Sequence, residues 1–190
     1  MRWDALFDDM EAQLAAAERL ELDSEIAERA RTEAAAVELA DRLRGSLGLR
    51  IGVYLASGST FEGTLSHAGS EALVLTEPRH QLLIPYSAAV RYLGLSRLAV
   101  AEPSRVRQRL GLASSLRAMA RDRASLAVLL SRGSAGESTL HGVIDRVGRD
   151  HLDLAVTADG VARREANVRE LATIPFAALA GIKSARSQED

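Results

Sequence analysis

The sequence predicts a mainly β protein with helices, in which two small barrels of five short strands follow one another, each preceded by a helix, behind an N-terminal helical arm. Apolar residues alternate with a period of two in two regions, and helical spacing precedes each region. The two strand regions also align without a gap from Thr60 to Leu75 at a constant offset of 79 positions. The identical pairs are Thr60/Thr139, Gly63/Gly142, Gly69/Gly148, Leu73/Leu152 and Leu75/Leu154. Internal similarity of this length indicates two units of like architecture.

Composition limits the class of protein. With 190 residues, 47% of them hydrophobic, the chain can bury one large core or two small ones, and the internal similarity favours two. The absence of cysteine excludes disulfides, thiolate nucleophiles and Cys-ligated zinc, and fits a reducing compartment. No apolar run approaches the ~20 residues of a membrane span. The N-terminus carries acids where a signal peptide needs apolar residues. We therefore expect a cytoplasmic protein with no membrane contact.

Charge is divided unevenly along the chain. Residues 1–41 hold twelve acidic and four basic residues, whereas the remainder holds 14 acidic and 20 basic residues. The first part therefore carries a net charge of −8 and the second part +6. Such a division suggests a body that binds a polyanion, or an arm that folds onto that body. Two unrelated solvated faces are the alternative.

Residues 1–45 are expected to form the acidic helical arm. Trp3, Leu6, Phe7, Met10 and Leu14 follow one stripe of a helix. An interruption is expected from Leu20 to Ser24, followed by a second helix to about Arg44. We take Trp3, Phe7 and Met10 as candidate partner-binding residues. Their docking on the chain's own core is the alternative.

Period-two alternation places the strands of the two barrels. The first barrel is expected over residues 46–100, with strands at 51–55, 60–66, 72–76, 82–84 and 89–93. The second is expected over 125–184, with strands at 126–130, 140–144, 152–156, 171–174 and 179–182. Gly63 inside a strand indicates a sharp bend, as in a small closing barrel. Residues 185–190 read as a disordered polar tail.

The connector at 101–124 is helical and basic. Its arginines, Arg105, Arg107, Arg109, Arg117, Arg121 and Arg123, face a single acid, Asp122, between residues 105 and 123. Because arginine stays charged and binds phosphate with two N–H groups, these six residues are candidates for tracking a nucleic-acid backbone. Tyr86 is a candidate for stacking on a base. Pairing of the same arginines with the acidic arm is the alternative.

One sequence motif resembles a known family. Val53-x-Leu55-x-x-Gly58-x-x-x-x-Gly63-x-Leu65 after a helix is similar to the first motif of the Sm-like proteins (LSm and Hfq). The resemblance covers most of 46–95 and, more loosely, 125–184, and other SH3-like barrels share much of it. It implies two tandem Sm-like or SH3-like barrels. It also implies that the glycine at Gly63 permits a bend, and that fourth and fifth strands pair between neighbours to close a ring.

The departures from that family concern its ligand. The Asp and Asn that read uridine in the family have no clear counterpart in residues 66–72, and Pro85-Tyr86-Ser87 stands where the second family motif is expected. In the second half, residues 133–138 lengthen the first turn. The resemblance therefore implies the barrel more strongly than a uridine pocket.

No catalytic constellation is evident. The four histidines are not spaced as metal ligands, and neither a Gly-x-Ser-x-Gly nucleophile motif nor a phosphate-binding glycine loop is present. We expect no enzyme activity, no cofactor and no metal.

The functional expectation is a non-catalytic, oligomeric protein that binds RNA, or DNA, mainly through the backbone. A protein-interaction or scaffolding module in transcription or RNA metabolism, without direct nucleic-acid binding, is the alternative. Self-association is expected through barrel edge strands or the helical arm. Three chains could close a six-module ring, and a monomer whose two barrels pair with each other is the rival.

Overall fold

The computed structural model describes residues 2–104, 111–131, 136–159, 161 and 163–185, without the side chains of residues 2–6 and 185. The chain divides into two compact units, Met1–Glu38 and Leu39–Asp190.

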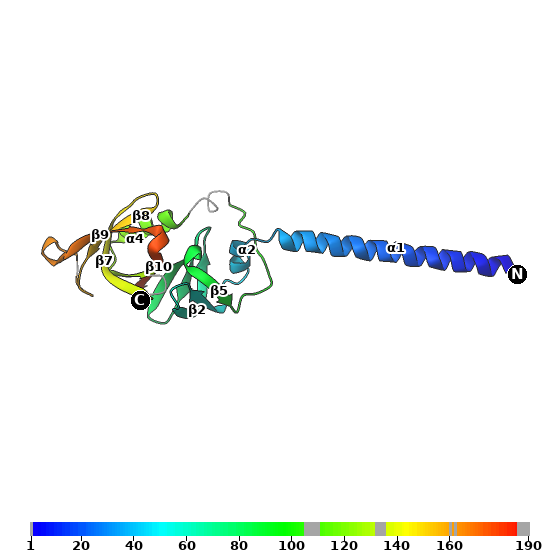
Figure 1. Ribbon diagram of the computed structural model, residues 1–190, viewed down its shortest axis with the longest axis horizontal. Coiled ribbons are helices and arrows are strands. Elements are labelled where there is room, and N and C mark those ends of the chain that lie inside the picture. The colour runs from blue at the N-terminus through cyan, green and yellow to red at the C-terminus, as the bar shows by residue number, and fades with distance from the viewer. Residues whose placement is uncertain (1, 105–110, 132–135, 160, 162, 186–190) are drawn as a thin grey trace. The chain divides into compact units, whose positions relative to one another are not determined.

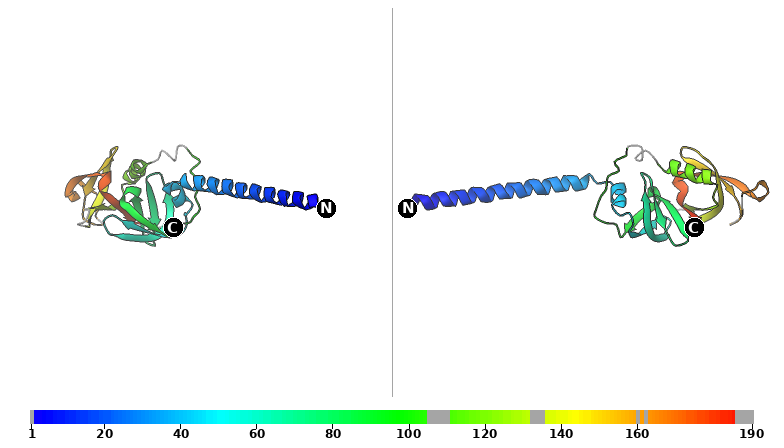
Figure 2. Two further views of the ribbon diagram at one scale, coloured as in Figure 1. Left: turned by 45° about the vertical axis from the view of Figure 1, so that its right-hand side comes forward. Right: turned by 180° about the vertical axis from the view of Figure 1, so that it is seen from behind.

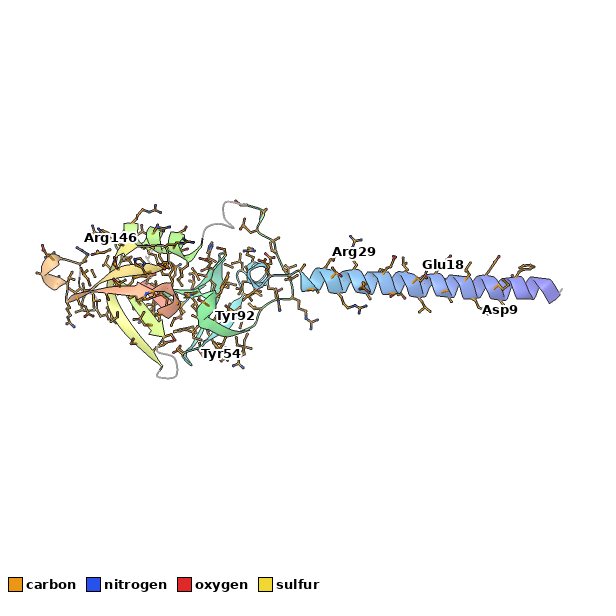
Figure 3. All side chains as sticks on the ribbon, turned by 45° about the horizontal axis from the view of Figure 1, so that its top comes forward. Asp9, Glu18, Arg29, Tyr54, Tyr92 and Arg146 are labelled. Atoms are coloured by element: carbon orange, nitrogen blue, oxygen red, sulfur yellow. The ribbon has the colours of Figure 1, made fainter. Side chains whose placement is uncertain are left out.

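The first unit contains one long helix, α1 (Arg2–Ala35) (Figure 1). The predicted interruption at Leu20–Ser24 is wrong, because that stretch holds neither glycine nor proline and its residues continue the helical hydrogen bonding. What changes there is the apolar face. At 100° per residue, Leu22 and Ile26 lie roughly a third of a turn around the helix from Phe7, Met10 and Leu14. Asp9, Glu18 and Arg29 project outward from the helix in Figure 3.

In the second unit, the described residues form ten strands that make one antiparallel sheet. The strands are β1 (Arg50–Leu55), β2 (Thr60–Ala68), β3 (Ala72–Thr76), β4 (His80–Pro85), β5 (Ala89–Leu93), β6 (Leu126–Ser131), β7 (Glu137–Val147), β8 (His151–Val156), β9 (Glu170–Pro175) and β10 (Leu179–Ala185). The described residues of this unit also form the helices α2 (Leu39–Arg44) and α4 (Leu112–Asp122) and the short 3₁₀ turns η1 (Tyr86–Ala88), η3 (Glu165–Asn167) and η4 (Phe176–Ala178). The expected ten strand positions and the mainly β class with helices are confirmed.

The prediction of two separate five-stranded barrels is wrong. The described strands form a continuous sheet in the order β5-β1-β2-β3-β4-β10-β6-β7-β8-β9, and this sheet is not closed. The two halves meet where β4 pairs with β10, with Ile182 opposite Leu83. A strand at the edge of a sheet presents unpaired N–H and C=O groups. Here the edge strand of one half, β4, pairs these groups with those of the edge strand of the other half, β10. The pairing joins them into one sheet.

The apolar core consists of two clusters that cross this junction. The first cluster takes Leu43 of α2 and most buried residues of β1–β4, but also Leu129 and Ala180 from the other half. The second cluster takes Leu116 of α4 and most buried residues of β6–β10, but also Leu83 from the first half. Because each cluster includes side chains from both halves, neither half buries its core alone.

Equivalent irregularities occur in the two halves of the sheet. Gly63 pairs with Ile51 and Gly142 pairs with Leu126, and the register then shifts between Leu65 and His67 in β2 and at the matching place in β7. A Cβ at Gly63 would lie 3.1 Å from the Thr76 carbonyl oxygen, and one at Gly142 would collide with the Ala155 carbonyl. Both glycines therefore permit a close approach of neighbouring strands. The sheet as a whole is curved rather than flat (Figure 2).

Candidate functional site

A cavity of about 820 Å³ lies beside α4 and is the candidate site. We call it the α4 groove. Its walls come from α4, from the turn between β2 and β3 and from β3 and β4, with contributions from α2 and from the segment after β5. The charged and titratable residues that line it are Arg44, His67, Glu71, Glu102, Arg117 and Arg121.

The start of α4 is capped by a residue from the other half of the sheet. The backbone N–H of Leu112 donates a hydrogen bond to Oε2 of Glu71, with a distance of 2.6 Å. Gly111 occupies the cap position, and no side chain of its own caps the helix. A negative carboxylate at a helix N-terminus is favourable, because the free N–H groups there carry partial positive charge. The Glu71 carboxylate therefore fixes the start of α4, which forms one wall of the groove.

Tyr86 holds the turn that carries Glu71. Its hydroxyl donates to the Gly69 carbonyl at 2.7 Å, and its backbone N–H donates to the Glu71 carbonyl at 2.8 Å. Burial raises the pKa of Tyr86 above its ordinary value, and the nearby Tyr92 adds to this shift. Tyr86 was a candidate for base stacking, but it is not among the residues that line the groove. The structure places it as a support behind the β2–β3 turn.

Arg117 and Arg121 are the two candidate arginines that the structure brings together in the groove. They are one helical turn apart on α4, so both lie on the same helix face, and both are exposed. Nη2 of Arg117 donates to the Gly148 carbonyl at 3.1 Å, which places α4 beside the β7–β8 turn. Within the described part of the chain, neither arginine forms an ion pair. Their charges are available to an anion.

The remaining candidates lie elsewhere. Arg123 follows α4 at its C-cap, is exposed and does not line the groove. Arg105, Arg107 and Arg109 lie outside the described residues. On α1, Phe7 is 58% exposed and Met10 is 57% exposed, while the side chain of Trp3 lies outside the description.

Sequence reasoning missed three residues around the groove. Arg44 donates to the Val100 carbonyl and pairs with Asp41, so its charge is already balanced. Arg146 of β7 and Arg149 in the β7–β8 turn are exposed, and α4 packs against β7 (Figure 3). The local pattern gave no sign that these arginines belong beside α4. The missing N-cap side chain before Leu112 was the one available signal that α4 takes its cap from a distant residue.

The described residues show neither a metal cluster nor a membrane-spanning helix. Among the described residues, no three His, Asp or Glu side chains are grouped as a metal site would require. His141 and His151 each contact a single carboxylate, of Asp159 at 3.1 Å and of Asp150 at 2.8 Å. In the described part of the chain, no helix has the length and apolar character needed to cross a membrane.

Comparison with known proteins adds no assignment to this geometry. A scan against models of protein families finds no match, and a search of curated proteins finds no significantly similar sequence.

Proposed function

We propose that this chain is a non-catalytic protein that binds nucleic acid through the phosphate backbone at the α4 groove. The observation that carries the proposal is the pair Arg117 and Arg121, which lie together beside a cavity of about 820 Å³ with no ion pair among the described residues. A guanidinium group binds phosphate through two parallel N–H groups and stays charged at any relevant pH.

The surroundings of the pair support a polyanion as the ligand. Arg146 and Arg149 extend the positive charge from α4 across the β7–β8 turn. The two carboxylates that line the groove are engaged, since Glu71 accepts from Leu112 and Glu102 accepts from the Ser104 N–H. These two carboxylates keep their charge, so the positive charge that a chain of phosphates would meet comes from Arg117 and Arg121 together with the exposed Arg146 and Arg149 outside the groove lining.

RNA is the first candidate within this class. The motif Val53 to Leu65 resembles that of the Sm-like proteins, which bind RNA. Because no uridine-reading residues are recognisable in residues 66–72, we expect binding with little base preference.

The test compares binding of short RNA and DNA oligonucleotides by fluorescence anisotropy at several salt concentrations. In the variant R117Q/R121Q we expect affinity to fall by about tenfold for each arginine. The slope of log affinity against log salt should also become shallower by about 1.4, because two fewer phosphates are neutralised at ~0.7 each. The matched control is R97Q/R164Q, which removes two exposed arginines that do not line the groove. Equal affinity of both variants and the parent would exclude this surface.

A protein-interaction module is the second candidate, and α1 is the feature that favours it. Phe7, Met10 and Leu14 are all more than half exposed on one face of this acidic helix. A folded sample that binds no oligonucleotide at low salt, and that loses a protein partner when residues 1–23 are deleted, would support this reading.

A further inference from the structure

The connection between β8 and β9 distinguishes the second half of the sheet from the first. It runs from residue 157 to 169, whereas the matching connection between β3 and β4 takes only residues 77–79. Long connections within a compact domain usually have a function beyond joining two strands. Arg163 of this connection is fastened to Asp145 of β7 by two hydrogen bonds, of 2.7 and 2.6 Å. The connection is therefore held beside β7.

A cavity of about 500 Å³ lies where this connection leaves β8 and enters β9. We call it the β8–β9 cavity. Its lining residues come from β7, from the end of β8 with the residues directly after it, and from the start of β9. None of them lines the α4 groove. The β8–β9 cavity is therefore a separate feature that the proposed function does not use.

The wall of this cavity holds a buried hydroxyl that has no partner. Thr157 is 3% exposed, and its Oγ1 forms no hydrogen bond among the described residues. Ser46, which is buried as well, donates to the Arg42 carbonyl at 2.8 Å and accepts from the Ser96 N–H at 2.9 Å. A buried hydroxyl without a partner is unfavourable, so a ligand would supply what the chain does not. A turn about χ1 between staggered rotamers presents this covered oxygen to the cavity.

An oriented imidazole stands next to this hydroxyl. The N–H of Thr157 donates to the His141 carbonyl at 2.9 Å, so the two residues lie opposite each other and their side chains share one side of the sheet. Nδ1 of His141 lies 3.1 Å from Oδ1 of Asp159. A carboxylate on one ring nitrogen fixes the ring and leaves Nε2 to a ligand. The wall thus offers two hydrogen-bonding groups, a hydroxyl and an imidazole.

Two opposite charges at the start of β9 also line the cavity. Arg169 and Glu170 are both exposed, and neither forms an ion pair within the described part of the chain. The third charged pair of groups there, Asp159 with His141, is already in contact. A ligand with one charge would be attracted by one of these two residues and repelled by the other. A ligand that carries both signs is complementary to both.

The remaining lining indicates the rest of the ligand. Leu140, Val156 and Ala158 give the cavity an aliphatic surface, on which a small apolar group can be buried. Among the described residues, no Phe, Tyr or Trp lines the cavity, so it offers no phenyl or indole ring on which a nucleobase could stack. A compact aliphatic group therefore fits this surface better than a planar ring does.

We propose that the β8–β9 cavity binds an aliphatic α-amino acid. Arg169 binds the carboxylate, for which a guanidinium has two parallel N–H groups, and Glu170 binds the ammonium group. The aliphatic side chain of the ligand packs against Leu140 and Val156, and the hydroxyl of Thr157 gains its missing partner. This inference uses neither the α4 groove nor nucleic acid, so its failure would leave the proposed function standing.

The test titrates the full chain with L-valine and follows the backbone amide signals by NMR. Isovalerate, which lacks the amine, and isobutylamine, which lacks the carboxylate, are the matched control compounds. L-valine should shift the signals of residues 157–159 and 169–170 in a saturable way, and each control should bind about tenfold more weakly. R117Q/R121Q should bind L-valine as the parent does. No saturable shift with L-valine at millimolar concentrations, or a control that binds as tightly, overturns the proposal.

Variants assign the roles within the cavity by the same titration. R169Q and E170Q should each lower the affinity for L-valine by about tenfold, while R164Q, at an exposed arginine outside the lining, should leave it unchanged. T157V keeps the shape of the side chain without the hydroxyl and should lower the affinity about fivefold, whereas T157S, which keeps the hydroxyl, should bind as the parent does. Because the hydroxyl has no partner in the empty chain, T157V should unfold at the same temperature or higher. Unchanged affinity in R169Q, or in a folded T157V, overturns the proposal.

Discussion

The carboxylate of Glu71 accepts a hydrogen bond of 2.6 Å from the backbone N–H of Leu112, so that a turn in one half of the sheet caps the helix of the other half. The two residues are 41 positions apart. Because Glu71 and the first turn of α4 both line the α4 groove, this contact fixes the width of the groove at that point. Glu71 therefore both caps α4 and forms part of the wall of the groove.

Replacing Glu71 with alanine should destabilise the chain by about 1 kcal/mol, the usual cost of losing a helix N-cap. The matched variant E71Q keeps an acceptor oxygen without the charge, so it should lose roughly half as much. Urea denaturation followed by circular dichroism measures both. An unchanged unfolding midpoint in E71A would show that the hydrogen bond contributes nothing.

Gly111 should be coupled energetically to Glu71. A Cβ at Gly111 would collide with the Glu71 carboxylate, although the backbone there, with φ of −79°, is open to any residue. G111A should therefore cost about 1 kcal/mol or more in the parent chain. In the E71A background it should cost nothing, because the obstacle is gone. A double-mutant cycle measures the coupling, and additive effects of the two substitutions would contradict it.

The strands could be predicted because their signal is local. Alternating residues such as Ile51, Val53 and Leu55 face the core, and this alternation is readable within a few positions. The glycines that allow strands to approach closely were also visible, since Gly63 and Gly142 stand at matching places in the aligned stretches. Local pattern therefore located the ten strands and the bends.

The pairing of the halves left no such local signal. The sequence of β4 predicts a short buried strand, but it does not indicate whether the second edge of this strand faces solvent, pairs within its own half or pairs with β10. The prediction of two separate barrels failed at this point, because Leu83 and Leu82 pair with residues about a hundred positions away. Of the candidate site, Arg117 and Arg121 could be named from composition and helical spacing. Glu71 could not, because its role depends on the same long-range junction.

Removal of the phenol hydroxyl should lower the stability of the chain at Tyr86 but not at Tyr92. Tyr86 donates to the Gly69 carbonyl, so Y86F should lower the free energy of unfolding by about 1 kcal/mol. The Tyr92 hydroxyl is buried and has no hydrogen-bond partner among the described residues. Y92F removes a buried hydroxyl that forms no hydrogen bond among the described residues, so the free energy of unfolding of this variant should equal or exceed that of the parent chain. Thermal unfolding at neutral pH distinguishes them, and a clear loss in Y92F would show that the hydroxyl has a partner.

The dependence on pH gives Tyr92 a separate test. Burial raises its pKa from 10.0 to about 12. Below pH 10 the phenol is protonated in both the folded and unfolded chains and contributes no pH dependence. As pH rises from about 10 towards 12 the unfolded chain ionises first, so the free energy of unfolding should fall. Over this pH range the free energy of unfolding should fall less steeply for Y92F than for the parent chain. Parallel curves for the two chains would contradict the buried position of the phenol.

Arg163 should stabilise the insert after β8 through its planar geometry rather than its charge alone. Its Nε and Nη2 donate to the two carboxylate oxygens of Asp145 on β7, at 2.7 and 2.6 Å, and both side chains are largely covered. R163K keeps the charge but loses the two parallel hydrogen bonds, and we expect it to unfold at a lower urea concentration than the parent chain. The matched control is R164K at the adjacent exposed arginine, which should be neutral within about 0.5 kcal/mol. Urea denaturation measures both, and equal midpoints would mean that the ion pair adds no stability.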